Sequence, residues 1–332
     1  MYTSEHFFCH DCVGRLGNAA GFSGSEENMQ INRKQKLNRS TSRALVFMFV
    51  PVVIYYLVFS YTPMYGIIIA FKDYKLAKGI MGSPWAGLTH FQRALNNPDF
   101  FRVFGNTLTI SFYKLLFGFP APILLALLIN ELRHLRFKKI VQTISYVPHF
   151  LSWIVLSGIL INFFSPSVGV INAVIKAGGG RPINFLADIK WFRPVLIISS
   201  IWKEVGWGSI VYLAAITGVD PELHEAAAID GAGRLRQVLH VTLPAITPVM
   251  LIMFIFAVGG IVGDDFDQIF NLYNPTVYSV GDVLSTYIYR QGLESMNYSY
   301  STAVGLFRTV ISFALVLFTN FLSKQVSDYG LW

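Results

Sequence analysis

Four ionisable side chains stand inside strongly apolar stretches of this chain, and their chemistry makes them candidates for contact with a polar ligand. They are Lys114, Lys203, Glu204 and Arg308. Ionisable groups at membrane depth are costly and usually functional, so each is a candidate for lining a substrate path. Pairing between helices is the alternative, because Lys203 or Arg308 could neutralise an acid. Lys114 has no acidic residue within one helical turn, which favours the path-lining interpretation for this residue.

Aromatic residues in and beside the same stretches could hold a sugar. A sugar ring packs on a flat apolar face while nearby polar groups bond its hydroxyls. Lipid contact or core packing is the competing interpretation for each aromatic residue. The basic residues would also suit the carboxylates of an anionic saccharide. The aromatic candidates are Tyr113, Trp202, Trp207, Tyr212 and Phe270.

The sequence lacks the motifs of common catalytic and nucleotide-binding sites. It contains no GxxxxGK[ST] phosphate loop, no HExxH, no GxSxG and no paired Cys/His zinc pattern. Cys9 and Cys12 form a single CxxC, which could be half a metal site, a redox pair or two unpaired thiols in a polar tail. We therefore expect no enzymatic activity and no cofactor bound by this chain. The net charge of +7 is spread over tails and loops, which does not favour nucleic-acid binding.

The elements that carry these residues are long apolar runs. Of the 332 residues, 53% are hydrophobic and 14% charged, against about 25% charged in a typical globular domain. A spanning helix needs about 20 mostly apolar residues, and six runs approach this length. We predict an all-α polytopic protein in a lipid bilayer, with a polar tail at 1–43 and a membrane domain at 44–332. The predicted spans are 44–61, 108–129, 140–164, 195–216, 248–263 and 303–322.

Basic residues set the predicted orientation. Lys and Arg concentrate before the first span and between the second and third, which places both segments in the cytoplasm. Both chain termini and residues 220–247 are then cytoplasmic. The loop 264–300 lies outside and is rich in acids, in agreement.

The polar stretch 220–247 has the pattern of a helix, a turn and a second amphipathic segment. Asp220 is a good N-cap and Pro221 suits the first helical position. Gly231 and Gly233 end or bend that helix, and Pro244 is expected to break the pattern before the fifth span. The helix shows alanines and carboxylates rather than bulky anchors and lysines, which favours docking to a protein over lying on the membrane surface.

The run EAAAIDGAGRLRQVLHVTLP, residues 225–244, resembles the EAA loop of binding-protein-dependent ABC importer permeases. In that family the loop forms a coupling helix that sits in a groove of the ATP-binding subunit. The resemblance implies that Glu225 pairs with or caps against that subunit, that Gly231 makes the turn, and that Pro244 sets the re-entry into the fifth span. The matched residues are Glu225, Ala226, Ala227, Asp230, Gly231, Ala232, Val241, Leu243 and Pro244.

The resemblance covers most of residues 44–332. Within the family, the chain is similar to the subgroup of type I importers that carry oligo- and polysaccharides. This similarity implies a transport subunit in the bacterial inner membrane, with an acidic, alginate-like saccharide as one candidate substrate. The implied partners are two ABC ATPase subunits that hold ATP and Mg, a second, related permease subunit, and a periplasmic or surface solute-binding protein. An ion-coupled secondary transporter or channel is the alternative, but such a protein would show internal repeats, and we find none.

Overall fold

The computed structural model describes residues 45–261 and 266–326, with side chains to residue 321. The tail that carries Cys9 and Cys12, and the acids Asp264 and Asp265, lie outside the described residues. The described part consists of helices and loops, with one isolated bridge between Lys72 and Trp85. The predicted all-α, polytopic class is therefore confirmed.

The chain divides into two compact units, Met1–Gly66 and Ile67–Trp332. The first unit is described from residue 45 as helix, with a π-helical turn η1 (Leu57–Tyr61) followed by α2 (Thr62–Met64). The π turn stands directly before Pro63. A proline cannot donate to the helical ladder and its ring crowds the carbonyl one turn back, so a wider turn before it removes the conflict.

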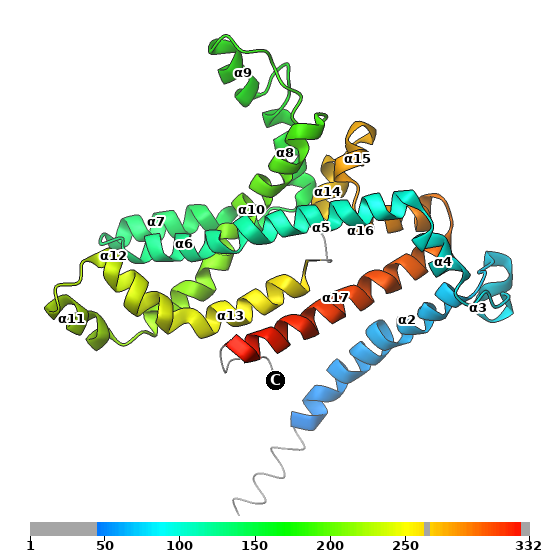
Figure 1. Ribbon diagram of the computed structural model, residues 1–332, viewed down its shortest axis with the longest axis horizontal. Helices are drawn as coiled ribbons and strands as arrows, with labels where there is room; N and C mark the ends of the chain where they lie inside the picture. Colours follow the sequence, from blue (N-terminus) through cyan, green and yellow to red (C-terminus); the bar gives the residue numbers. More distant parts are fainter. Residues whose placement is uncertain (1–44, 262–265, 327–332) are drawn as a thin grey trace, which may run out of the picture. The chain divides into compact units, whose positions relative to one another are not determined.

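Helix η2 (Tyr65–Phe71) ends the first membrane-length helix. The helices that follow it belong to the second unit (Figure 1). They begin with η3 (Leu76–Lys78), α3 (Gly79–Gly82), α4 (Thr89–Leu95), α5 (Pro98–Gly118), α6 (Pro120–Asn130), α7 (Leu135–Tyr146), η4 (Val147–Phe150), α8 (Trp153–Phe163) and α9 (Val170–Ala177). The rest are α10 (Ile189–Thr217), α11 (Pro221–Ile229), α12 (Arg234–Gln237), η5 (Val238–Thr242), α13 (Leu243–Gly259), α14 (Phe266–Leu272), η6 (Pro275–Val277), α15 (Tyr278–Gly281), α16 (Leu284–Tyr289), η7 (Arg290–Glu294) and α17 (Tyr298–Val326).

Four helices in the described part of the chain are long and apolar enough to cross a membrane by themselves. They are Leu45–Phe71, Pro98–Asn130, Arg234–Gly259 and Tyr298–Phe321. The predicted fourth span, 195–216, lies within α10, whose 29 residues reach about 43 Å. Helix α10 is not among the four and carries four charged residues.

The predicted third span, 140–164, contains a sharp bend that its apolar pattern did not indicate. The chain bends by 103° between Leu135–Phe150 and Trp153–Phe163. Pro148 is the second residue of the short helix η4, and the Ser152 hydroxyl accepts a hydrogen bond from the Val155 amide as N-cap of α8. A proline followed by a serine cap ends one helix and begins another, so the apolar run forms two helices with a sharp bend between them.

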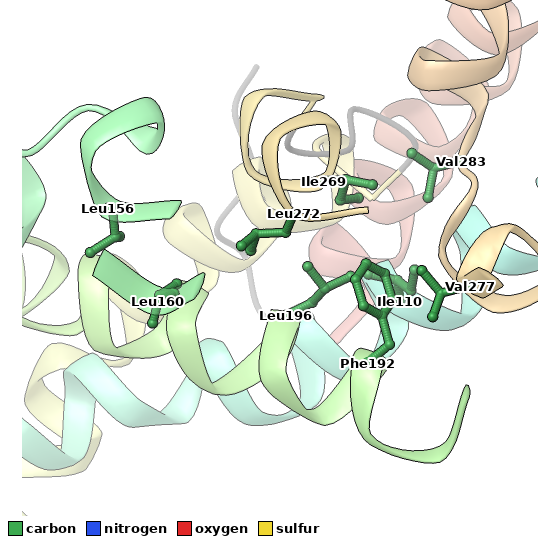
Figure 2. Close-up of a cluster of buried hydrophobic side chains, with 9 residues drawn as sticks. All are labelled: Ile110, Leu156, Leu160, Phe192, Leu196, Ile269, Leu272, Val277 and Val283. Atoms are coloured by element: carbon green, nitrogen blue, oxygen red, sulfur yellow. The ribbon is translucent and has the colours of Figure 1, made fainter. Parts of the chain in front are cut away.

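Helix α10 is the central element of the second unit, because it packs against α5, α6, α7 and α13. Figure 2 shows one of the clusters that hold it, in which apolar side chains of α5, α8, α10 and α14 meet. Ile110, Leu196 and Ile269 are almost fully buried there. Packing of this kind fixes the short helix α14 against α10 and α8, and this contact positions the polar groups described below.

Candidate functional site

Helix α11 begins where the sequence predicts. The Asp220 carboxylate accepts a hydrogen bond from the Glu222 amide at 3.0 Å, and Pro221 is the first helical residue. An N-cap carboxylate satisfies a backbone donor that the helix leaves unpaired and favours the positive end of the helix dipole. The start of α11 is therefore specified by two adjacent residues.

The end of α11 is closed by Gly231, which adopts a φ of 76°. The amide of Ala232 donates to the carbonyl of Ala227 at 2.9 Å, and the amide of Gly231 donates to that of Ala228 at 3.1 Å. This pair of bonds is a Schellman motif, which satisfies the last carbonyls of a helix and needs a left-handed residue at the Gly231 position. The alanines of this stretch thus supply part of the turn as well as a small surface.

The helix that follows runs from α12 through η5 into α13 without a break. The predicted break at Pro244 was therefore wrong. The Leu243 amide donates to the Val238 carbonyl, five residues back. This π-helical turn lies immediately before Pro244, as η1 does before Pro63, and it removes the clash that the proline ring would meet in a regular α-helix. Residues 234–259 are therefore one helix of 26 residues.

Most of the predicted coupling residues lie on the surface. Glu225, Ala226, Asp230 and Gly231 are exposed and Ala227 is half-buried, while Leu243 and Pro244 belong to the first turn of α13. Bulky apolar side chains accompany them, and two of these lie on α11, where alanines and carboxylates were expected rather than bulky anchors. The exposed ones are Leu223, Ile229 at 87%, Leu235 at 73% and Leu239.

Figure 1 shows α11 at one end of the second unit, beyond the ends of α6 and α13. An Arg234–Glu131 ion pair with an N–O distance of 3.1 Å connects this end to α6. We call the exposed face of residues 220–239 the loop surface. Its combination of small, acidic and apolar side chains suits the groove of another protein.

A second feature is a cavity of about 410 Å³ between α5, α6, α10 and α13. We call it the α5–α10 cavity. Its wall is mostly apolar and includes Phe119, Pro122 and Met253. The polar side chains in its wall are those of Ser111, Lys114, Ser200, Glu204 and Tyr212.

Lys114 is held at the cavity wall by a residue that the sequence analysis missed. Its ammonium donates to the side-chain oxygen of Gln268 at 2.5 Å. The Gln268 side chain is fully buried and donates from its amide nitrogen to the Leu196 carbonyl at 2.7 Å and to the Ser199 hydroxyl at 2.9 Å. The partners lie 154 and 72 residues apart in the sequence, so no local pattern could have indicated the contact.

Lys203 and Glu204 follow the pairing alternative. The Lys203 ammonium, on a side chain that is 8% exposed, lies 3.1 Å from one Glu204 oxygen and donates to the His149 carbonyl at 2.9 Å. The other Glu204 oxygen lies 2.8 Å from Nδ1 of His149. Trp207 stacks on the His149 ring with 4.5 Å between centroids. The cluster connects α10 to η4, at the bend before α8.

The other candidates lie elsewhere. Trp202 lines a separate apolar cavity of about 510 Å³ beside α8, and Arg308 lines a third cavity on α17. Tyr113 stacks on Phe117, and Phe270 packs on Phe266 and Tyr289. The structure therefore brings together Lys114, Glu204 and Tyr212 and leaves these four candidates outside the α5–α10 cavity.

A buried ion pair supports the segment before α17. Both Nη atoms of Arg290 contact the Asp282 carboxylate, at 2.5 and 3.2 Å, and Asp282 is fully buried. Burial lowers the pKa of Arg290, but the hydrogen bond and charge of Asp282 outweigh it and raise the pKa above its ordinary value. Asp282 also accepts a hydrogen bond from Thr286. This pair lies outside the α5–α10 cavity and has a structural role.

In the described ranges, no group of three or more His, Cys, Asp or Glu side chains could hold a metal ion.

Comparison with known proteins gives consistent matches. Residues 118–328 match the family model described as "binding-protein-dependent transport system inner membrane component". The polygalacturonan/rhamnogalacturonan transport system permease protein YteP of Bacillus subtilis is 46% identical over 288 residues, 87% of this chain and 90% of that protein. Protein LplB of the same organism is 44% identical over 288 residues, 87% of this chain and 91% of that protein.

Two solved structures are similar over most of the chain. One is a bacterial alginate ABC transporter in complex with an alginate pentasaccharide-bound periplasmic protein. Its matched chain has a TM-score of 0.81 and 42% identity, with 89% of this chain and 100% of that chain covered. The other is a bacterial ABC transporter involved in the import of the acidic polysaccharide alginate, with the same TM-score and identity, 89% of this chain and 99% of that chain.

Proposed function

The chain belongs to the family of binding-protein-dependent transport system inner membrane components and is a sugar ABC transporter permease; from this premise we propose that ATP hydrolysis on partner subunits drives it through α11, and that it imports an acidic oligo- or polysaccharide. The observation that carries the coupling proposal is the loop surface, where a capped helix and a glycine turn are joined to a membrane-spanning helix.

The covalent arrangement of this region supports transmission of force. α12, η5 and α13 form one continuous helix, residues 234–259. A displacement of α11 would therefore move this helix, which lines the α5–α10 cavity through Met253 and Ala257. The Schellman turn at Gly231 fixes the angle between α11 and this helix. Closure of an ATPase around α11 would then change the shape of the cavity.

The proposed partners follow from the relatives. An ABC permease operates with ATPase subunits, and the chain lacks a phosphate loop of its own, so we place ATP and Mg on two partner ATPase subunits. The similar alginate transporter was solved with a periplasmic protein that holds the saccharide, which supports a solute-binding protein as a partner. A second, related permease subunit would complete the membrane part, with both termini of this chain in the cytoplasm.

The proposed substrate class has two supports. One relative is named for polygalacturonan and rhamnogalacturonan, and two similar structures for alginate, which is described as acidic. In the wall of the α5–α10 cavity, the Lys114 ammonium accompanies the hydroxyls of Ser111, Ser200 and Tyr212. An ammonium group forms charge-assisted hydrogen bonds with carboxylates, and hydroxyls can bond those of a sugar.

A crosslinking experiment tests the coupling proposal. Cys9 and Cys12 are replaced by serine, and Ala226→Cys is introduced on α11. The variant is co-purified with its ATPase subunits and treated with a short crosslinker that has a maleimide for the new thiol and a photoactivated group for the neighbouring protein. We expect a crosslink to the ATPase. Val168→Cys is the matched control, since this side chain is 76% exposed but precedes α9, far from α11 in Figure 1. Equal crosslinking at both positions, or none at Ala226→Cys, would refute the proposed docking.

A further inference from the structure

We propose that the outer face of α7 binds an anionic phospholipid, with its phosphate held by basic side chains at the start of the helix and an acyl chain lying along an apolar stripe. The proposal depends on the membrane permease class of the chain and not on its saccharide. We call this surface the α7 lipid face. Its exposed residues are Arg133, Arg136, Phe137, Lys139, Ile140, Ile144 and Val147.

Helix α7 has an inner and an outer face. The inner face packs on α10 and α6; there Val141 joins an apolar cluster and the Ser145 carbonyl lies close to Gly206 of α10. The apolar residues of the α7 lipid face recur every three or four positions, which places them together on the other side of the helix. Each is more than half exposed, so the described part of the chain leaves this stripe uncovered.

The stripe has the length of one bilayer leaflet. Ten positions separate Phe137 from Val147, which corresponds to about 15 Å along a helix. The hydrocarbon core of a bilayer is about 30 Å thick, so an acyl chain of one leaflet matches the stripe. The membrane-length helix Pro98–Asn130 ends just before this segment, and the next apolar helix begins at Leu135. The start of α7 therefore lies at a membrane boundary.

The basic side chains stand at that boundary. Residues 131–139 contain four Lys or Arg and one acid, Glu131, which is in contact with Arg234 at 3.1 Å. None of the four cations forms an ion pair within the described residues. Arg136 and Lys139 lie three positions apart on the exposed side of the helix, where like charges repel. A phosphate between them relieves that repulsion and accepts charge-assisted hydrogen bonds from both.

The combination of stripe and cations favours an anionic lipid over other occupants. A soluble anion would use the cations and leave the stripe bare. A neutral lipid, or an apolar helix of the second permease subunit, would cover the stripe without neutralising Arg136 and Lys139. An anionic phospholipid satisfies both parts, since clusters of Lys and Arg beside a membrane-spanning helix attract such headgroups.

The experiment measures lipid binding to the complete transporter, purified in detergent with its second permease and ATPase subunits. Native mass spectrometry follows its titration with phosphatidylglycerol and, separately, with phosphatidylcholine of the same acyl chains. Arg136→Gln/Lys139→Gln removes two cations, Arg136→Lys keeps the charge, and Ile140→Ser/Ile144→Ser interrupts the stripe. Inorganic phosphate, which has the charge but no acyl chain, is the competitor.

The matched control is Lys176→Gln/Arg181→Gln. It also removes two exposed cations, but these lie in and just after α9, a helix that is far from α7 in Figure 1. Binding by this variant should match that of the wild type, because the control leaves the α7 lipid face intact.

We expect the wild type to bind phosphatidylglycerol more tightly than phosphatidylcholine. Arg136→Gln/Lys139→Gln should raise the Kd for phosphatidylglycerol roughly thirtyfold, because each Lys or Arg near an anionic surface contributes about a factor of five, and it should leave the Kd for phosphatidylcholine unchanged. Arg136→Lys should retain the preference. The stripe variant should weaken binding of both lipids and keep their ratio.

An unchanged Kd for phosphatidylglycerol in the double glutamine variant, or an equal increase in the α9 control, would overturn the proposal. Displacement of the lipid by millimolar inorganic phosphate would overturn it in favour of a site for a free anion. A wild-type complex without any preference for phosphatidylglycerol would also overturn it and indicate that another occupant, such as the second permease subunit, covers the face.

Discussion

Replacing Gly231 by alanine should weaken docking of the ATPase subunit by up to about fivefold, although a Cβ at this position has no atom within 4 Å. A Cβ at Gly231 has nothing within 4 Å, so steric crowding is excluded as a cause. The effect comes from the backbone, because the φ of 76° is one that residues with a Cβ adopt at a cost.

The magnitude follows from that angle. The left-handed conformation costs about 1–2 kcal/mol for an L-residue with a side chain, and the reduced freedom of alanine in the unfolded chain returns about 0.4–1 kcal/mol. A net cost of about 1 kcal/mol lowers the ratio of formed to unformed turn roughly fivefold. If only the formed turn docks, the Kd of the ATPase rises toward that factor, to the extent that the turn opens in the free permease.

Gly233→Ala is the matched control two residues away. Gly233 has a φ of −65°, and a Cβ added there would also have nothing within 4 Å, so alanine at this position should leave the Kd unchanged. Gly231→Asn should lie between wild type and Gly231→Ala, because asparagine tolerates the left-handed region better. The assay is titration of the purified permease complex in detergent with fluorescent ATPase subunit. Equal Kd values for the two alanine variants would refute the reasoning.

Three further predictions concern stability, each measured as the midpoint of thermal unfolding. Gly206→Ala should destabilise the protein by about 1–3 kcal/mol, because its Cβ would overlap the Ser145 carbonyl of α7. Asp282→Asn should cost about 3 kcal/mol, since it leaves the half-buried Arg290 without its counter-charge. Burial raises the pKa of Tyr273 from about 10 to about 12. The stability that this shift contributes is present below pH 10 and is lost as pH rises through 12. Tyr273→Phe should therefore reduce the alkaline decline, which is the fall of the unfolding midpoint above pH 10.

Each of these has its own check. Gly105→Ala has open space around the new methyl group and should be tolerated, so equal effects of the two alanines would contradict the crowding argument. Asp188→Asn removes a charge from a surface N-cap of α10 and should cost little, because asparagine caps as well as aspartate does. For Tyr273→Phe, an alkaline decline as steep as in the wild type would show that other groups dominate it.

Local rules were sufficient to predict α11 and its turn. The cap of Asp220, the position of Pro221 and the left-handed Gly231 depend on neighbours within a few residues, and the sequence contains all of them. The same rules failed at Pro244, where a π-helical turn just before the proline keeps the helix continuous. A proline is evidence of a break only if the backbone before it stays in regular α-helix.

Contacts between distant segments could not be predicted. The sequence singled out Lys114 by its isolation from acids, but its contact with Gln268 depends on how α14 packs against α10. The same limit applies to Trp202 and Arg308, whose residue types suit a sugar site although each lines a different cavity. Residue type predicts what a side chain can bind, and packing decides which side chains share a site.

The most direct test of the central claim is saccharide uptake into liposomes that contain the complete transporter with its ATPase and binding protein. We predict uptake of an acidic oligosaccharide that requires ATP and continues when ionophores collapse the ion gradients across the membrane. Uptake by this permease without the ATPase, driven by an ion gradient, would contradict the account and support an ion-coupled transporter instead.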